Sequence, residues 1–413
     1  MKRRYRYRIY PTKTQEKSLA QLFGCTRVVW NDALAFCKTA LESGLKYPGF
    51  STLSSQFITQ AKQTEARAWL SEVAFAPLQQ SLRDLDEAFR NFWNSIKGKR
   101  KGAAMKPPRF KKRSSTQSAR FTRTAFKLRQ HKVYLVKVGN LKIEWSRPLP
   151  AQPSSVTVIK DPSGRYFLSF VVECEPTPMP QTDKAVGIDL GIKTFATLSN
   201  GEKIDAPMPL KKSLKKLRRL QQRLSRRQKG SRRRELARLQ LAKLYAKITD
   251  IRSDFLQKLS TRLIRENQAI ALENLNVSGM LKNRKLSRAI SDLGWRSFRD
   301  MLEAKSVMYG RDLHIIDRWE PTSQACSCCG ERGGKLDLSI RLWECLFCGT
   351  THDRDVNAAK NIKAAGGHSE AINGRGGLHK TRLDRAVPSE TSTHQEPIQL
   401  SLFGETGIPV PLG

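Results

Sequence analysis

The first 180 residues alternate between two kinds of hydrophobic pattern. Residues 3–10, RRYRYRIY, alternate basic with aromatic or aliphatic side chains, which predicts a strand with one wet, positive face. Helical periodicity follows over residues 14–44 and 51–96, and the second stretch has an apolar face formed by Leu78, Leu82, Leu85, Phe89, Phe92 and Trp93. Residues 119–172 alternate again around a hairpin turn at 161–164. We expect a small β-barrel or sheet whose first strand is residues 3–10.

Acidic residues interrupt apolar runs in the second half of the chain. The stretch AVGIDLGIKTFATLSNG, residues 185–201, predicts two short buried strands joined by a glycine turn, with Asp189 inside the first strand. A buried carboxylate without a partner is strongly destabilising, so Asp189 must be paired. Glu273 likewise ends a short apolar strand, and Asp353 and Asp355 precede an alanine-rich helix. Each acid alone could be a helix cap or a lysine partner, but divalent cations would satisfy them together.

Residues 208–266 have the periodicity of a helical hairpin. Leucines step by three and four before Gly230 and Ser231 interrupt the pattern, and the apolar stripe then continues. Between Lys211 and Arg238 there are fourteen basic residues and one acid. A run of charge is usually a solvated face, but this density favours a surface that follows a nucleic-acid backbone. The residues expected to bind nucleic acid are Lys211, Lys212, Lys215, Arg218, Arg219, Arg226 and Arg227.

The overall charge agrees with such a surface. The chain of 413 residues contains 75 Lys and Arg against 37 Asp and Glu, a formal net charge of +38. An excess of this size repels itself unless a polyanion neutralises it, and nucleic acid is the favoured polyanion over an anionic membrane. The chain has no apolar run of transmembrane length and no signal-peptide pattern, so we expect a cytoplasmic protein without a membrane partner.

The cysteines predict a structural zinc site. Cys326 and Cys329 form one C-x-x-C pair, and Cys345 and Cys348 form a second pair after fifteen intervening residues. This spacing is typical of a four-thiolate zinc ribbon, whose closed coordination makes the metal structural. Cys328 could replace a neighbour, although the register favours the first pair. The isolated cysteines are expected to be buried thiols: Cys25, Cys37 and Cys174.

Several motifs in order resemble one protein family. GIDLGIKTFATLSNG, IALENLN and a zinc ribbon leading into HDRDVNAAKNI are similar to the RuvC-like, RNase H-fold nuclease segments of the TnpB (OrfB) proteins of bacterial insertion sequences, which are related to type V CRISPR effectors. RIYPTKTQEKSLAQLFGCTRVVWNDAL near the start and LGWRSFRDMLEAKSVMYG before the ribbon add to the likeness. The resemblance covers about residues 1–365.

The resemblance implies a catalytic site and a mechanism. The family's three catalytic acids fall on Asp189, Glu273 and Asp355, with Asp353 a less favoured substitute for the last. These acids would hold two Mg²⁺ or Mn²⁺ ions, bridged by Asp189, for phosphodiester hydrolysis. The implied activity is RNA-guided DNA cleavage, with a guide RNA made from the transposon end and double-stranded target DNA as partners. The N-terminal helices and barrel would read a short motif beside the target. Alternatives are a guide-dependent DNA-binding regulator without cleavage and a protein-guided transposase or recombinase.

The implied fold is a multidomain α/β protein with a split RuvC-like nuclease domain, a helical recognition lobe, a small β-barrel and an inserted zinc ribbon. The expected order is barrel strand 1–12, helical domain 13–105, remaining barrel 106–180, first nuclease part 181–320 with the basic hairpin 208–266, zinc ribbon 321–350, second nuclease part 351–366 and mobile tail 367–413.

Overall fold

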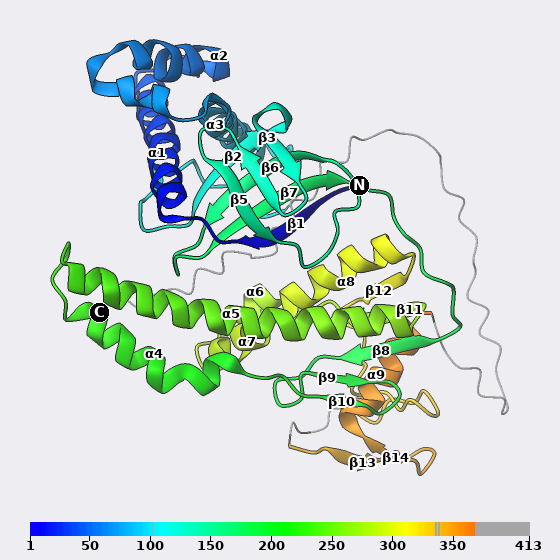
Figure 1. The fold of residues 1–413 in the computed structure, drawn as a ribbon. Coiled ribbons are helices and arrows are strands. Elements are labelled where there is room, and N and C mark those ends of the chain that lie inside the picture. The colour runs from blue at the N-terminus through cyan, green and yellow to red at the C-terminus, as the bar shows by residue number, and fades with distance from the viewer. Residues whose placement is uncertain (101, 335–336, 338, 368–413) are drawn as a thin grey trace. The chain divides into compact units, whose positions relative to one another are not determined.

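The computed structural model describes residues 1–100, 102–334, 337 and 339–367 (Figure 1). The chain divides into two compact units, Met1–Cys174 and the described residues from Glu175 onward. The tail expected to be mobile, apart from residue 367, lies outside the described residues. No helix in the described part combines the length and the apolar character that crossing a bilayer requires.

The first unit contains a seven-stranded sheet in the order β2-β6-β7-β1-β5-β4-β3. Its strands are β1 Lys2–Ile9, β2 Gln117–Thr122, β3 Phe126–Arg129, β4 Lys132–Leu135, β5 Gly139–Glu144, β6 Pro153–Lys160 and β7 Tyr166–Glu173. The predicted strand at residues 3–10 is confirmed as β1, which pairs antiparallel with β7 along its length and with β5 at its end. A three-residue turn, Arg123–Ala125, joins the two edge strands, so the sheet is nearly closed.

The helices of the first unit depart from the sequence prediction in one place. The helix predicted at 14–44 is confirmed as α1 Lys13–Glu42, but residues 51–96 form several pieces. They are α2 Gly49–Ser54, a π-helical turn Ser55–Gln60, 3-10 turns Ala61–Gln63 and Glu65–Glu72, and α3 Phe75–Ile96. Pro77 explains the break before α3, because a proline ring clashes with the carbonyl four residues earlier and is tolerated only in a first turn.

Helices and sheet of the first unit share one hydrophobic core. Buried side chains of α1, α3 and the strands form a single cluster around Tyr7, Phe121 and Phe170. On α3 the predicted face is buried at Leu78, Leu82, Leu85 and Phe89, whereas Phe92 and Trp93 are half-buried. Cys25 and Cys37 are buried as expected, and burial raises the pKa of each thiol to about 11. Cys174 is half-buried.

The second unit is built on a five-stranded sheet in the order β10-β9-β8-β11-β12 (Figure 1). Its strands are β8 Ala185–Asp189, β9 Ala196–Leu198, β10 Lys203–Ile204, β11 Ala269–Glu273 and β12 Asp312–Ile316. The two strands predicted within residues 185–201 are confirmed as β8 and β9, which pair antiparallel. Because β8, β11 and β12 run parallel, their carboxyl ends meet at one edge of the sheet.

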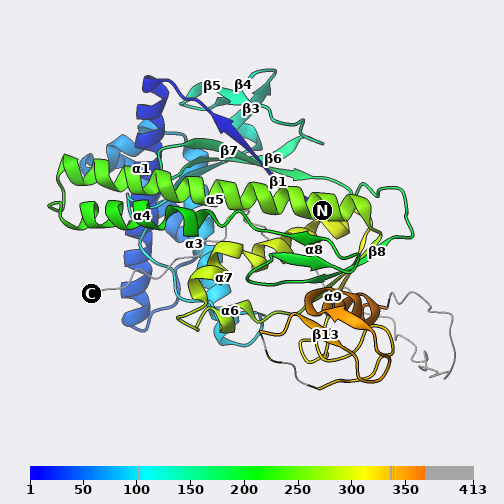
Figure 2. The same ribbon diagram turned by 90° about the horizontal axis from the view of Figure 1, so that it is seen from below.

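Helices cover this sheet and extend from it. They are α4 Pro209–Ser225, α5 Arg232–Glu266, α6 Val277–Met280, α7 Ser287–Leu293, α8 Trp295–Tyr309 and α9 Arg354–Ala365. The predicted hairpin is confirmed as α4 and α5, with Ser231 capping α5. Figure 2 shows α9 beside β8, where Gly187 permits close approach, since a Cβ there would overlap the backbone of Ala359 and Lys363.

A small two-stranded sheet precedes α9. It consists of β13 Leu342–Glu344 and β14 Thr351–Asp353, which pair antiparallel. The hairpin register sets Leu342 opposite Asp353, and the amide of Arg354 donates to the carbonyl of Arg341 at 2.8 Å. The start of α9 is therefore tied directly to the segment that carries the second cysteine pair.

Candidate functional site

Two of the expected acids lie at the carboxyl ends of neighbouring parallel strands. Asp189 is the last residue of β8, and Glu273 is the last residue of β11. The register pairs Ile188 with Leu272, so the two carboxylates follow matching positions on adjacent strands. Polar side chains at this edge of a parallel sheet converge on one site. The sheet register therefore brings together two residues that are far apart in the sequence.

The third acid, Asp355, comes from the first turn of α9 and joins this cluster. Burial raises the pKa of Asp189 to about 7, and the negative charges of Glu273 and Asp355 add to the shift. The opposing charges of Arg354 and Arg341 lower it but do not cancel the effect. A divalent cation would stabilise the charged form of a carboxylate that is partly desolvated and repelled by two others. The three side chains supply the hard oxygen atoms that Mg²⁺ or Mn²⁺ requires, so the donor set fits.

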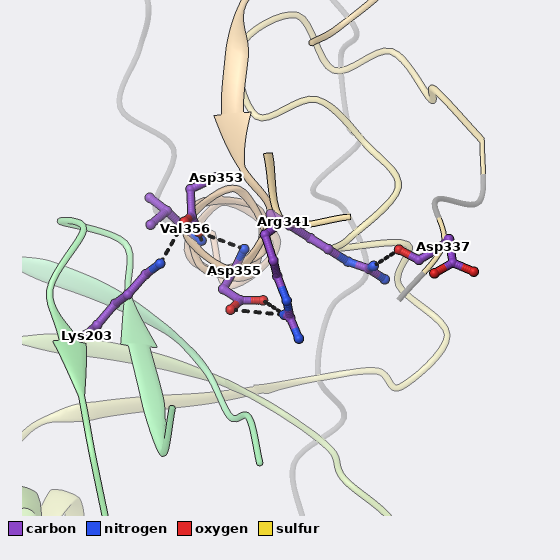
Figure 3. A network of polar contacts seen from close by, with 7 residues as sticks. Lys203, Asp337, Arg341, Asp353, Asp355 and Val356 are labelled. Carbon is purple, nitrogen blue, oxygen red and sulfur yellow. Dashed lines mark hydrogen bonds and ion pairs between the residues drawn. The ribbon is translucent and has the colours of Figure 1, made fainter. Parts of the chain in front are cut away.

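Asp353 and Asp355 have different roles, as Figure 3 shows. One oxygen of Asp353 accepts hydrogen bonds from the amides of Asp355 and Val356, both at 3.1 Å, and caps α9. The other oxygen accepts from Lys203 Nζ at 2.6 Å. Burial alone would raise the pKa of Asp353, but these hydrogen bonds hold it below its usual range. Both oxygens of Asp353 are thus bound by protein donors. It is the negative charge of Asp355 that contributes to the raised pKa of Asp189.

Protein partners also hold Asp355 and Glu273. A guanidinium nitrogen of Arg341 lies 3.0 and 3.3 Å from the two carboxylate oxygens of Asp355 (Figure 3). The hydroxyl of Thr322 donates to Glu273 Oε1 at 2.7 Å. The side-chain amide of Asn361, on α9, donates through Nδ2 to the backbone carbonyl of Thr322 at 2.8 Å. These contacts connect the end of β11, the segment entering the ribbon and α9.

Sequence reasoning missed three residues of this site: Lys203, Thr322 and Arg341. None belongs to a motif, and each reaches its carboxylate over a long stretch of chain, 150 residues in the case of Lys203 and Asp353. The one local signal lies at Arg341, because the β13–β14 hairpin encloses the second cysteine pair and sets Arg341, just before β13, beside the start of α9. The pairing itself appears only in the tertiary structure.

The four predicted cysteines converge in the ribbon. The Sγ atoms of Cys326, Cys329, Cys345 and Cys348 all lie within 4.8 Å of one another. Cys326 and Cys348 are 3.7 Å apart, and Cys329 and Cys345 are 3.6 Å apart. Tetrahedral thiolates at a Zn–S distance of about 2.3 Å would stand about 3.8 Å apart, so the spacing fits zinc.

Two neighbours complete the ribbon cluster. Cys328 is exposed, and it is the backbone amide of this residue that approaches Cys326 Sγ, at 3.4 Å. The buried ring of His352 places Nε2 3.0 Å from the same sulfur. His352 is therefore not one of the four sulfur ligands but contacts one of them, Cys326. Residues that contact metal ligands in this way commonly orient them. The geometry favours the pairing that the C-x-x-C register predicts.

The basic residues expected to bind nucleic acid gather along α4. A groove of about 610 Å³ is lined by Lys211, Lys212, Leu214, Lys215, Arg218, Arg219 and Gln222. No acid lines this groove, and five of the seven expected residues do. Arg226 and Arg227 follow at the end of α4. A continuous row of cations without acids is suited to successive phosphates.

Comparisons with family models and with curated proteins show the family of the chain. A family model described as "Probable transposase" (OrfB_IS605) matches residues 169–284, and a "Cas12f1-like, TNB domain" model matches residues 295–362. The chain is 46% identical to a Streptomyces pristinaespiralis protein over 96% of each chain, and 33% identical to InsQ of Escherichia coli over 88% of this chain and 92% of that one. Both bear the name "Putative RNA-guided DNA endonuclease". The chain belongs to the TnpB/OrfB family.

A third family match concerns the N-terminus. The "Helix-turn-helix domain" of the same family matches residues 1–46 of this TnpB/OrfB protein. In the structure this segment contains β1 and the single long helix α1, Lys13–Glu42. The N-terminal segment here is therefore a strand of the seven-stranded sheet followed by one helix.

Solved structures show the same fold at low sequence identity. A Cas12f1–sgRNA–target DNA complex contains a chain that is 14% identical, with a TM-score of 0.51, over 88% of this TnpB/OrfB chain and 98% of that chain. The mini-RNA-guided endonuclease CRISPR-Cas_phi3 is 10% identical, with a TM-score of 0.51, over 91% and 94% of the two chains. The mixed α/β fold is thus that of Cas12 effectors.

Proposed function

We propose that this TnpB/OrfB protein is an RNA-guided DNA endonuclease that hydrolyses phosphodiester bonds at Asp189, Glu273 and Asp355. The observation that carries the proposal is the position of Asp189, a half-buried carboxylate at the end of β8 that two other acids repel. A structural protein gains nothing from such an arrangement, since it costs folding free energy. The names of the relatives support the same activity.

The three acids would hold two Mg²⁺ or Mn²⁺ ions. Such ions supply an activated water and stabilise the leaving 3′ oxygen. The residues of the chain position the acids for this chemistry. Thr322 orients Glu273 through its hydroxyl, and Lys203 with the Asp353 cap holds the first turn of α9, from which Asp355 extends. The four cysteines would hold one structural Zn²⁺ that maintains the ribbon.

The sheet and α9 support a RuvC-like, RNase H-fold nuclease domain that is split by the ribbon. Two acids come from strands before the ribbon, and Asp355 follows it. We assign the nuclease to 181–320 and 351–366, the ribbon to 321–350, the barrel to 1–12 and 106–180, and the helical recognition domain to 13–105. The basic groove on α4 supports nucleic-acid binding by this part of the chain.

The positive charge of the protein indicates which parts of the complex bind nucleic acid and which supply sequence specificity. A guide RNA made from the transposon end would occupy basic surfaces and pair with one DNA strand, while the first unit reads a short motif beside the target. Base pairing then supplies sequence specificity, and the protein supplies cations and the cleavage site. With this activity we expect the protein to lie in the cytoplasm of a prokaryote, associated with the nucleoid when it is bound to DNA.

Cleavage of a plasmid tests the proposal. The tagged protein is purified with its RNA from a cell that carries its genomic neighbourhood, and is given Mg²⁺ and a plasmid that matches the guide and has randomised flanks. Linear product that disappears with Asp189→Ala and after ribonuclease treatment establishes the activity. RNA-dependent binding without cutting would indicate the regulator, and cutting that survives ribonuclease would indicate a protein-guided recombinase.

A further inference from the structure

The guanidinium of Arg341 lies where a cation is needed in the carboxylate cluster. One of its nitrogens contacts both oxygens of Asp355, at 3.0 and 3.3 Å (Figure 3). Its charge also acts on Asp189, because it opposes the rise in the pKa of that carboxyl. Arg341 therefore partly neutralises two of the three acids that the proposed function assigns to divalent ions.

The backbone of Arg341 is held while its side chain is accessible. Its carbonyl accepts from the amide of Arg354 at 2.8 Å, and the following residue, Leu342, pairs with Asp353 in the ribbon hairpin. The side chain of Arg341 is 47% exposed and that of Asp355 is 28% exposed. The guanidinium can therefore turn away from Asp355 by side-chain rotation alone, and it remains tethered beside the cluster when it does.

We propose that Arg341 is a placeholder cation, which occupies Asp355 until a divalent ion binds and displaces it. This inference rests on the proposed function, in which Asp355 is a metal ligand. Arginine and the ion compete for the same two oxygens, so the apparent affinity for the ion is reduced by the fraction of molecules in which the pair is formed. The displaced guanidinium stays at the cluster, available to a phosphate of the DNA strand.

The competition predicts opposite effects of one substitution on two measurements. Arg341→Gln removes the competitor, so the Kd for Mn²⁺ at the cluster falls about threefold or more, in line with a partly exposed ion pair. The same change removes a cation from the cleavage site, so the cleavage rate falls. A residue that only supports the fold would not tighten metal binding when it is removed.

Arg354→Gln is the matched control. The charge of Arg354 also acts on Asp189, but its guanidinium donates to the carbonyl of Asp337 at 2.7 Å, and no contact with Asp355 is found for it. This variant therefore removes one nearby positive charge without removing a competitor for Asp355. Its Kd for Mn²⁺ is expected to stay within about twofold of the unsubstituted protein.

Electron paramagnetic resonance of free Mn²⁺ measures these affinities on the RNA-bound, zinc-loaded full chain. Mn²⁺ bound by RNA is subtracted with the complex of a variant in which Asp189, Glu273 and Asp355 are all alanine. Zinc content verifies that the ribbon is intact in each variant. Tighter Mn²⁺ binding in Arg341→Gln alone supports the placeholder role.

Two outcomes overturn the inference. Unchanged or weaker Mn²⁺ binding in Arg341→Gln would show that the arginine does not compete, and an equal gain in Arg354→Gln would show a general charge effect. Asp355→Asn tests the proposed function separately. If Asp355→Asn leaves Mn²⁺ affinity unchanged, Asp355 is not a ligand and the proposed site itself is wrong; if it weakens binding while Arg341→Gln has no effect, only the placeholder role fails.

Discussion

The cysteine cluster and the carboxylate cluster lie in the same unit but are drawn from different ranges of sequence. The four cysteines fall between Cys326 and Cys348, and their sulfur atoms gather within 4.8 Å. The carboxylates come from β8, β11 and α9. Among the described residues, only the four cysteines bring their potential ligand atoms so close together. Two of the acids are instead engaged by protein donors, Arg341 and Thr322. Ligands that are close in sequence can be placed by a short hairpin, whereas distant ones depend on sheet register and on neighbours that hold them.

The largest expected effect tests whether cleavage at the carboxylate cluster depends on the cysteine cluster. Cys345→Ser removes one of four ligands, so zinc is lost and the β13–β14 hairpin that places Arg341 and the start of α9 is no longer held. We expect DNA cleavage to fall by roughly a hundredfold or more, because misplacement by about 1 Å can cost that much. Zinc content by metal analysis and cleavage of a matched plasmid measure the two effects.

Cys328→Ser is the control for this substitution. Cys328 is exposed and makes its contact to Cys326 through the backbone, which serine retains. Zinc content and cleavage should match the unsubstituted protein. Full cleavage by Cys345→Ser would show that the carboxylate cluster does not depend on the ribbon.

A second substitution tests the hydrogen bond that orients Glu273. Thr322→Val keeps the shape of the side chain and removes the hydroxyl that donates at 2.7 Å. Loss of one such hydrogen bond corresponds to about 1 kcal/mol, so we expect the cleavage rate to fall about fivefold. Thr322→Ser restores the hydroxyl and should recover the rate, and an equally slow serine variant would rule out orientation by hydrogen bonding.

A smaller effect is expected at Lys203. Its ion pair with Asp353 is partly exposed, and Asp353 still caps α9 without it. Lys203→Met should therefore slow cleavage only about threefold, the scale of an exposed pair. Single-turnover cleavage at rising salt tests the cause, because screening should shrink the difference between Lys203→Met and the unsubstituted protein. A difference that persists at high salt would contradict an electrostatic role.

The last expected effect concerns stability and its dependence on pH, not the cleavage rate. The folded-state pKa of Asp189, about 7, lies above the usual value for an aspartate, so ionisation in the folded protein is disfavoured by burial and by two neighbouring acids. In chelator, stability is therefore lost as pH rises from about 4 towards 7. Asp189→Asn should melt a few degrees higher at pH 8 and equally at pH 4, as measured by thermal unfolding. An equal shift at both pH values would exclude titration of Asp189 as the cause.

Local sequence patterns predicted the elements well where the governing interactions are local. The alternation of residues 3–10 predicted β1, and the interruption at Gly230 and Ser231 predicted the turn between α4 and α5. The helical pattern of residues 51–96 was only partly right, because Pro77 and the extended backbone at Thr64 divide it into short pieces. Periodicity reports which face is buried and does not report where the backbone must leave the helix.

The sequence by itself determined the charge, the cysteine register and the three acidic motifs of this protein. Those features depend on spacing within a few residues or on composition alone. Only the tertiary structure decided that Asp355 and not Asp353 acts on Asp189, and that Lys203, Thr322 and Arg341 hold the acids. The physical reason is that strand register and helix packing bring together side chains from distant segments, and no local spacing encodes which of them will meet.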